Sequence, residues 1–137
     1  MESSETTPPK SISAAAACAE RFITTPRGRR HALPLFLPVC QLNDPFVPMD
    51  VLRDEMRVDG GIINAYFLYK QRELRDRFDD GLTLREYVGL CDGLLVTDSG
   101  AFQGFVRKLF LSNKTIVAFQ ERIGTDVSSP LDLVTPP

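Results

Sequence analysis

Two aspartates, Asp98 and Asp132, are the residues of this chain best placed to do chemistry, because each ends an apolar segment. Residues 94–97 (Leu-Leu-Val-Thr) have the composition of a strand buried on both faces, and such a strand would present Asp98 at its end. The small residues 99–101 that follow leave room for a ligand to approach the backbone. The alternative for Asp98 is a turn in which its side chain bonds its own backbone, and Asp132 could likewise cap the turn before Thr135.

The spacing of the expected strands predicts where the two aspartates lie. Strands are expected to start at Ile62, Leu94 and Val127, which are 32 and 33 residues apart, with helical patterns between them. This spacing is typical of successive strand–helix units that build a parallel sheet. Because parallel strands all point the same way, Asp98 and Asp132 would lie at the same edge of the sheet, where α/β proteins carry their sites. A (β/α)8 barrel and a doubly wound open sheet both fit this pattern.

The other elements follow from apolar periodicity and from capping residues. Residues 1–20, rich in Ser, Thr, Pro and Ala, predict a disordered leader. A helix capped by Ser112 or Asn113 would carry apolar side chains on one face. Those side chains are Ile116, Phe119 and Ile123. The expected strands cover residues 35–39, 62–66, 94–97 and 126–131, and the other expected helices cover residues 48–56 and 68–78.

Composition and charge limit the classes of function. With 137 residues, 43% of them hydrophobic and 25% charged, the chain has the composition of one globular domain. A net charge of −2 leaves no overall basic field, so a nucleic-acid partner would have to be held by local patches such as residues 27–31 and 70–77. No apolar segment approaches the ~20 residues that span a bilayer, and the start of the chain is acidic. We therefore expect a cytoplasmic protein without a membrane partner.

The cysteines and histidine indicate no metal site within the chain. Cys18, Cys40 and Cys91 are far apart and show no Cys-x-x-Cys spacing, and His31 is the single histidine. An odd number of scattered cysteines fits a reducing compartment. We expect Cys40 and Cys91 to be buried free thiols.

Five stretches of the chain, in order, resemble the tRNA-guanine transglycosylases, in particular the archaeosine type that works on archaeal tRNA. The subtype follows from three details: Asn64-Ala65-Tyr66, Ala101 after Gly100, and proline rather than alanine before Leu131-Asp132. The matching stretches are residues 37–39 (Leu-Pro-Val), 62–66 with Tyr69 and Lys70, 97–103 (Thr-Asp-Ser-Gly-Ala-Phe-Gln), 119–126 (Phe-Gln-Glu-Arg-Ile-Gly-Thr-Asp), and 130–132 with Thr135, Pro136 and Pro137.

The resemblance implies a fold and a reaction. Residues 21–137 would form the N-terminal half of a (β/α)8 barrel, with parallel strands alternating with helices. The family is one of glycosyltransferases, which exchange a guanine in tRNA for a 7-deazaguanine; for the archaeosine type that base is preQ0 and the nucleotide is at position 15. A carboxylate attacks the ribose C1′, guanine leaves, and the incoming base displaces the enzyme, so two carboxylates in distinct roles are needed.

Roles are carried over from the family residue by residue. Asp98 matches the aspartate that handles the base proton, which has also been described as the nucleophile in archaeal members. Asp132 matches the aspartate that accepts hydrogen bonds from the ring N–H and the amine of the base. Asn64 and Tyr66 would line the pocket or support it. The loop around the base is matched by Ser99, Gly100, Ala101 and Phe102, of which Phe102 would either wall the pocket or fill the core.

The family also carries features that this chain lacks. A (β/α)8 barrel typically takes ~250 residues, and the resemblance places a further catalytic aspartate, the ligands of a structural zinc and an RNA-binding module beyond Pro137. We therefore expect that the chain binds no zinc and does not exchange bases alone. It would be a truncated product, one half of an enzyme completed by a second polypeptide or a homodimer, or a noncatalytic paralogue. A related enzyme that inserts deazaguanine into DNA is a further alternative.

Overall fold

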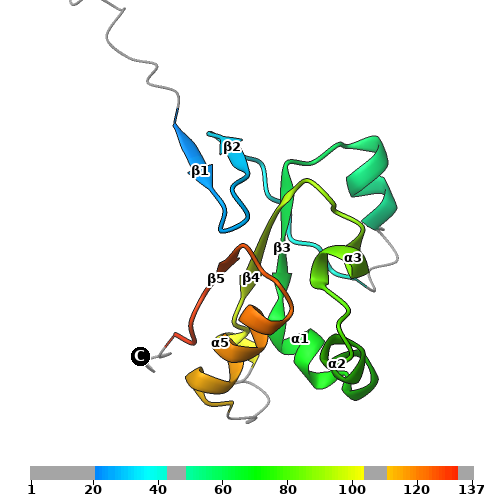
Figure 1. The fold of residues 1–137 in the computed structure, drawn as a ribbon, viewed down its shortest axis with the longest axis vertical. Coiled ribbons are helices and arrows are strands. Elements are labelled where there is room, and N and C mark those ends of the chain that lie inside the picture. Colours follow the sequence, from blue (N-terminus) through cyan, green and yellow to red (C-terminus); the bar gives the residue numbers. More distant parts are fainter. Residues whose placement is uncertain (1–20, 43–48, 104–110, 133–137) are drawn as a thin grey trace, which may run out of the picture.

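A computed structural model describes residues 21–42, 49–103 and 111–132. The expected leader lies outside these ranges, as does Pro48, the expected first residue of the helix at 48–56. Figure 1 shows a small parallel sheet with helices packed beside it and an antiparallel hairpin at one end. None of the helices in the described ranges is long and apolar enough to cross a membrane.

The central sheet has the parallel topology that the spacing predicts. Its order is β3 (Gly60–Asn64), β4 (Leu94–Asp98) and β5 (Val127–Ser128), and both pairs are parallel. A single parallel bridge joins Val39 to Ile62, so the segment before β3 lies along the edge of β3 that faces away from β4. Neighbours in the sheet are thus neighbours in the chain order, and all carboxyl ends lie at one edge.

Two glycines explain how closely β3 approaches its neighbours. A Cβ at Gly60 would overlap the carbonyl oxygen of Leu94 on β4, and a Cβ at Gly61 would lie 2.5 Å from the Sγ of Cys40. These glycines form the first two residues of β3, ahead of the expected strand start at Ile62. Only glycine fits at these two positions, because a side chain would keep β3 from approaching its neighbours this closely.

Helices cover one face of the sheet. They are η1 (Val51–Glu55), a single wide turn, and α1 (Ala65–Lys70), α2 (Arg72–Asp79), α3 (Leu84–Val88) and α5 (Asn113–Arg122). The side chains of Ile63, Leu95 and Thr97 on this face are at most 1% exposed. On the other face Leu94 is 1% exposed, Val96 is half-buried and Asp98 is exposed, so the expected burial on both faces holds at the start of β4 and is lost toward its carboxyl end.

Helix α5, between β4 and β5, forms as expected. Ser112 caps α5 by accepting a hydrogen bond from the backbone of Thr115, at 3.1 Å. The predicted apolar face is buried, with Ile116, Phe119 and Ile123 at most 2% exposed. Burial of such a face supplies most of the stability of a short helix.

Four expected boundaries are wrong. The strand at 62–66 ends at Asn64, because Asn64 caps α1. The helix at 68–78 is two helices, since Gln71 has an extended conformation (φ −82°, ψ 99°) between them. The strand at 35–39 is reduced to the Val39 bridge, because Pro38 has no N–H to donate to a neighbouring strand. The strand at 126–131 pairs over Val127–Ser128 only.

Sequence patterns missed two elements. The hairpin β1 (Phe22–Thr24) and β2 (Arg30–Ala32) is too short for a clear alternation of apolar and polar residues. Helix α3 has only five residues, but it begins with a capping box in which Thr83 and Glu86 bond each other. The bonds donated by Thr83 lower the pKa of the Glu86 carboxyl. This Thr-x-x-Glu spacing was a signal available in the sequence.

A buried ion pair ties together the amino ends of the strands. The Asp126 carboxylate, 2% exposed, accepts from the Arg85 guanidinium at 2.6 Å, from Arg27 at 3.2 Å and from the Leu95 backbone at 2.9 Å. Arg85 also donates to the backbone carbonyls of Leu90, Cys91 and Gly93, at 2.6, 3.1 and 2.9 Å. Burial lowers the pKa of Arg85 and the Asp126 carboxylate opposes that shift, so the guanidinium stays charged. One side chain from α3 thus joins β4, β5 and the loop between α3 and β4.

Replacement of Arg85 with alanine is expected to destabilise the fold strongly. The change leaves three carbonyls and a buried carboxylate without this donor, and loss of one partner of a buried pair typically costs about 3–5 kcal/mol. Urea unfolding followed by circular dichroism measures the loss. The control is Arg122→Ala, which removes an ion pair to Asp79 whose side chains are 46% and 48% exposed and which should cost under about 1 kcal/mol. Equal losses in the two variants would contradict this account.

Candidate functional site

Asp98 is the last residue of β4 and projects from the carboxyl edge of the sheet. It lies beside Asn64, the last residue of β3, in the parallel register. The buried strand delivers an exposed carboxylate, as the sequence predicts. The arrangement follows from the parallel pairing, which ends both strands at the same level.

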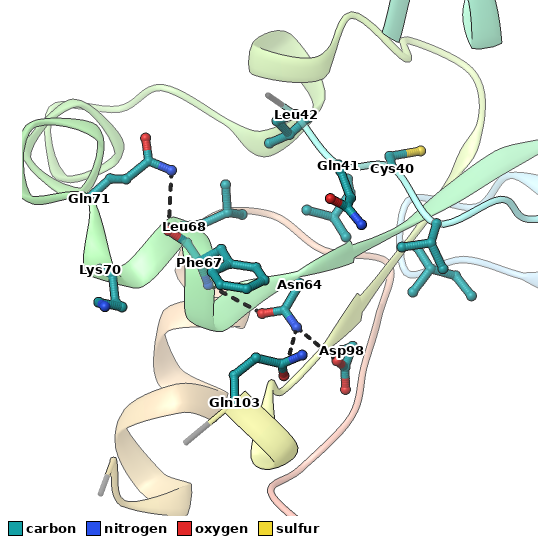
Figure 2. A pocket seen from close by; sticks show the side chains of 13 residues that line it. Cys40, Gln41, Leu42, Asn64, Phe67, Leu68, Lys70, Gln71, Asp98 and Gln103 are labelled. Carbon is teal, nitrogen blue, oxygen red and sulfur yellow. Dashed lines mark hydrogen bonds between the residues drawn. The ribbon is translucent and has the colours of Figure 1, made fainter. Parts of the chain in front are cut away.

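The side-chain amide of Asn64 organises this edge. Its Oδ1 accepts from the backbone N–H of Phe67 at 3.2 Å and so caps α1. Its Nδ2 donates to the Asp98 carboxylate at 3.1 Å and to Oε1 of Gln103 at 3.2 Å. Figure 2 shows the three polar side chains of Asn64, Asp98 and Gln103 meeting beside the pocket. One amide therefore begins a helix and orients a carboxylate.

Gly100 allows the loop after Asp98 to pack against the start of α1. Its φ is +74°, a left-handed conformation that disfavours other residues. A Cβ at this position would overlap the Cβ of Tyr66 and lie 2.9 Å from Oδ1 of Asn64. A side chain at residue 100 would thus disturb the Asn64 amide directly.

A pocket of about 700 Å³ opens beside this cluster. Its walls are apolar near the sheet, and its polar groups lie toward the carboxyl edge, with Asp98 at one side and Lys70 at the end of α1 (Figure 2). Among the described residues, Lys70 forms no ion pair, although its Nζ lies 5.7 Å from the ring centre of Tyr66. The pocket is lined by Val39, Cys40, Gln41, Leu42, Ile62, Ile63, Asn64, Phe67, Leu68, Lys70, Gln71, Asp98 and Gln103.

The expected loop residues surround Asp98 without lining this pocket. Ser99 is 1% exposed, and its backbone N–H donates to Oγ of Ser129 at 3.1 Å. Ala101 is half-buried beside Gly100. Phe102 is 65% exposed, so the alternative that it fills the core is wrong. Its ring is available at the surface of the carboxyl edge.

The remaining expected residues fall into different places. Asp132 lies four residues beyond the end of β5 and is exposed, on the carboxyl side of the sheet, and it does not line the pocket. Asn64 lines the pocket, whereas Tyr66 is 1% exposed inside the core and does not. Cys40 is buried as expected, and burial raises the pKa of its thiol. Cys91 is exposed, which contradicts the expectation that it is buried.

Sequence patterns did not single out several residues of the pocket. Gln103 belongs to the same motif as Asp98. It was not predicted as a site residue because it lies five residues after Asp98, beyond the turn of small residues. Phe67 lies between the expected strand at 62–66 and the expected helix at 68–78, and it reaches the pocket with Lys70 and Gln71 because α1 starts directly at the end of β3. The Asn cap was the signal for that early start.

Within the described ranges, no three His, Cys, Asp or Glu side chains are grouped so that they could hold a metal ion. The resemblance places the ligands of the family's structural zinc outside these ranges, beyond Pro137.

Comparison with known proteins places the chain in a family. Residues 20–137 match the family described as queuine tRNA-ribosyltransferase. The chain belongs to this family, the tRNA-guanine transglycosylases, whose members are glycosyltransferase-type enzymes that act on tRNA. The resemblance seen in the sequence motifs is thereby confirmed.

Three relatives that the chain resembles are named tRNA-guanine(15) transglycosylase. It is 39% identical over 113 residues to the protein of Methanopyrus kandleri, 37% over 112 residues to that of Pyrococcus abyssi and 39% over 110 residues to that of Methanosarcina mazei. These matches cover 80%, 80% and 77% of this chain. They cover 24%, 18% and 20% of the relatives, so the chain spans a quarter or less of their length.

Two substitutions of Asn64 should separate its capping role from its donor role. Asn64→Ser keeps an oxygen that can cap α1, and Asn64→Ala removes it, whereas both remove the amide that donates to Asp98. Loss of a cap costs about 0.5–2 kcal/mol, so the alanine variant should unfold at lower urea concentration than the serine variant. Urea titration of both variants beside the unchanged chain tests this. Equal stability of the serine and alanine variants would show that the cap contributes nothing.

Proposed function

We propose that this chain carries part of the active site of a tRNA-guanine transglycosylase that exchanges guanine in tRNA for a 7-deazaguanine, preQ0, on the archaeosine pathway. The observation that carries the proposal is the Asp98 carboxylate, held by the Asn64 amide at the rim of the pocket. A carboxylate fixed by one hydrogen bond keeps other lone pairs free to accept from a base. An apolar pocket with a few convergent polar groups is typical of small-ligand sites.

The fold proposed for the complete enzyme is a (β/α)8 barrel, of which residues 21–137 supply the N-terminal half. The order Val39 segment, β3, β4, β5 supports a barrel, because each strand pairs with the next one in the chain. A doubly wound sheet reverses its strand order at a switch point, and the described strands contain no reversal. Carboxyl-end residues such as Asp98 are where barrels of this kind carry catalysis.

The proposed chemistry is substitution at the glycosidic carbon. One carboxylate forms a bond to C1′ while the bond to guanine breaks, and the leaving base takes up a proton; the incoming base then gives up a proton and displaces the carboxylate. Asp98 is proposed to exchange the base proton or to act as the nucleophile. Asp132 is proposed to accept hydrogen bonds from the base, with Ser99, Gly100, Ala101 and Phe102 forming the loop around it.

The pocket also offers contacts to the nucleic acid. Lys70 supplies a cation and Gln71 an amide donor on the same rim as Asp98. Such groups are suited to phosphates, which dominate the affinity of proteins for nucleic acids. The proposed acceptor is tRNA, as named for the relatives, and DNA remains the alternative acceptor.

The isolated chain is not proposed to catalyse the exchange. Among the described residues, the three strands and the Val39 bridge leave both flanks of the sheet unpaired, and Val39 and Val127 on these flanks are 64% and 41% exposed. A second polypeptide, a second copy of the chain or a continuation of the same chain would have to complete the barrel. A noncatalytic paralogue would use the same pocket for binding alone.

The test is a chimera of a full-length relative. Residues 20–137 of this chain replace the aligned segment of the Methanopyrus kandleri protein, and incorporation of radiolabelled guanine into tRNA measures exchange. The chimera should exchange guanine, and Asp98→Asn should lower the rate by about 10²–10⁴-fold, the usual size of a proton-transfer contribution. The 137-residue chain alone should incorporate no label.

The matched control is Asp92→Asn, which changes an exposed aspartate just before the other end of the same strand. It should leave the rate unchanged. A folded chimera without exchange would contradict the proposed function. If the chimera is active and Asp98→Asn and Asp92→Asn exchange guanine at the same rate, Asp98 has no catalytic role.

A further inference from the structure

We infer that Gln120 and Ser129 are positioning residues, which clamp the Asp98 turn to the segment that carries Asp132. The inference rests on the proposed function, because it concerns the relative placement of those two carboxylates. It is carried by hydrogen bonds between three parts of the fold that are distant in sequence: the end of β4, helix α5 and the segment after β5.

Gln120 joins β4 to the segment after β5 from inside the core. Its side chain is fully buried, at 0% exposure. The Thr97 hydroxyl donates to its Oε1 at 2.6 Å, and its Nε2 donates to the carbonyl of Ser129 at 3.0 Å. Buried amides that satisfy both ends in this way fix the separation of the groups they join. Thr97 immediately precedes Asp98, so the clamp acts next to the carboxylate.

Ser129 closes the same link at the carboxyl edge. Its Oγ accepts from the backbone N–H of Ser99 at 3.1 Å, and its own N–H donates to the carbonyl of Thr97 at 3.0 Å. The pairing of β5 with β4 in regular register ends at Ser128. Just after β4 ends, the Ser99 N–H therefore bonds the Ser129 hydroxyl in place of a backbone carbonyl of the neighbouring strand.

The segment continues toward Asp132 under a further restraint. The N–H of Leu131 donates to Oδ1 of Asn113, the first residue of α5, at 3.1 Å. Helix α5 thus holds this segment with a side chain from its start and with Gln120 near its end. Thr97 before Asp98, and Ser129 and Leu131 before Asp132, are therefore all tied to α5.

The clamp matters because base exchange needs both carboxylates on one base. A displacement of about 1 Å in a catalytic geometry can lower a rate by about 10²-fold. Neither Gln120 nor Ser129 lines the pocket, so a change in either acts through Asp98 and Asp132. Ser129 is the better residue to vary, since it is half-buried and its replacement leaves the Gln120 core intact.

The experiment compares three variants in the chimera. Ser129→Ala removes the acceptor for Ser99, Ser129→Thr restores a hydroxyl, and Ser128→Ala changes the exposed neighbour, whose side chain forms no hydrogen bond in the described structure. Ser129→Ala should lower kcat by about tenfold to a hundredfold, with little change in KM for tRNA and in melting temperature. The threonine variant should recover most of kcat, and Ser128→Ala should match the unchanged chimera.

Amide hydrogen exchange at Ser99 gives a readout independent of catalysis. In the 137-residue chain, Ser129→Ala should speed exchange at this amide relative to Ser128→Ala. If the unchanged chimera is active while Ser129→Ala and Ser128→Ala share the same kcat and the same Ser99 exchange, the clamp is refuted and the proposed function stands. An inactive unchanged chimera refutes the proposed function instead, and equal Ser99 exchange would then refute the clamp separately.

Discussion

The edge where chemistry is proposed depends on one hydrogen-bonding side chain, the amide of Asn64. It ends β3, starts α1 and holds the Asp98 carboxylate. Because the two strands are parallel and in register, the amide and the carboxylate stand at the same level. The close approach of Gly100 to the same amide leaves no room for another residue type. The end of β3, the start of α1 and the orientation of the Asp98 carboxylate therefore all depend on the same side chain.

The two edges of the sheet have different tasks. At the amino edge, Arg85 and Asp126 form a buried pair whose hydrogen bonds are satisfied within the fold. At the carboxyl edge, Asp98 is exposed, and the side chain that donates to it is the Asn64 amide rather than a cation. This division is usual in barrel enzymes, in which one end serves stability and the other carries the site. The Asp126 carboxylate is buried among its three donors, whereas the exposed Asp98 carboxylate has lone pairs that a ligand can reach.

Much of this arrangement was predictable from the sequence, and the failures have physical causes. The strand before Asp98, the parallel topology and the buried face of α5 follow from apolar periodicity, which the core enforces. Predicted element boundaries were wrong where a side chain competes with the hydrogen bonds between strands. Asn64, for example, caps α1 and ends β3 two residues before the expected end. The place of Phe102 at the surface was open, because an aromatic residue after a tight turn suits a core or a pocket equally. The Arg85 pair was not predictable, since it joins residues 41 positions apart.

The central claim is that Asp98, as Asn64 presents it, meets the base. A crystal structure of the chimera soaked with guanine tests this most directly. The account predicts a base bound beside the Asp98 carboxylate, with a ring N–H within hydrogen-bond distance of it and the Asn64 amide still on the carboxylate. A base bound elsewhere, with Asp98 facing solvent, would contradict it.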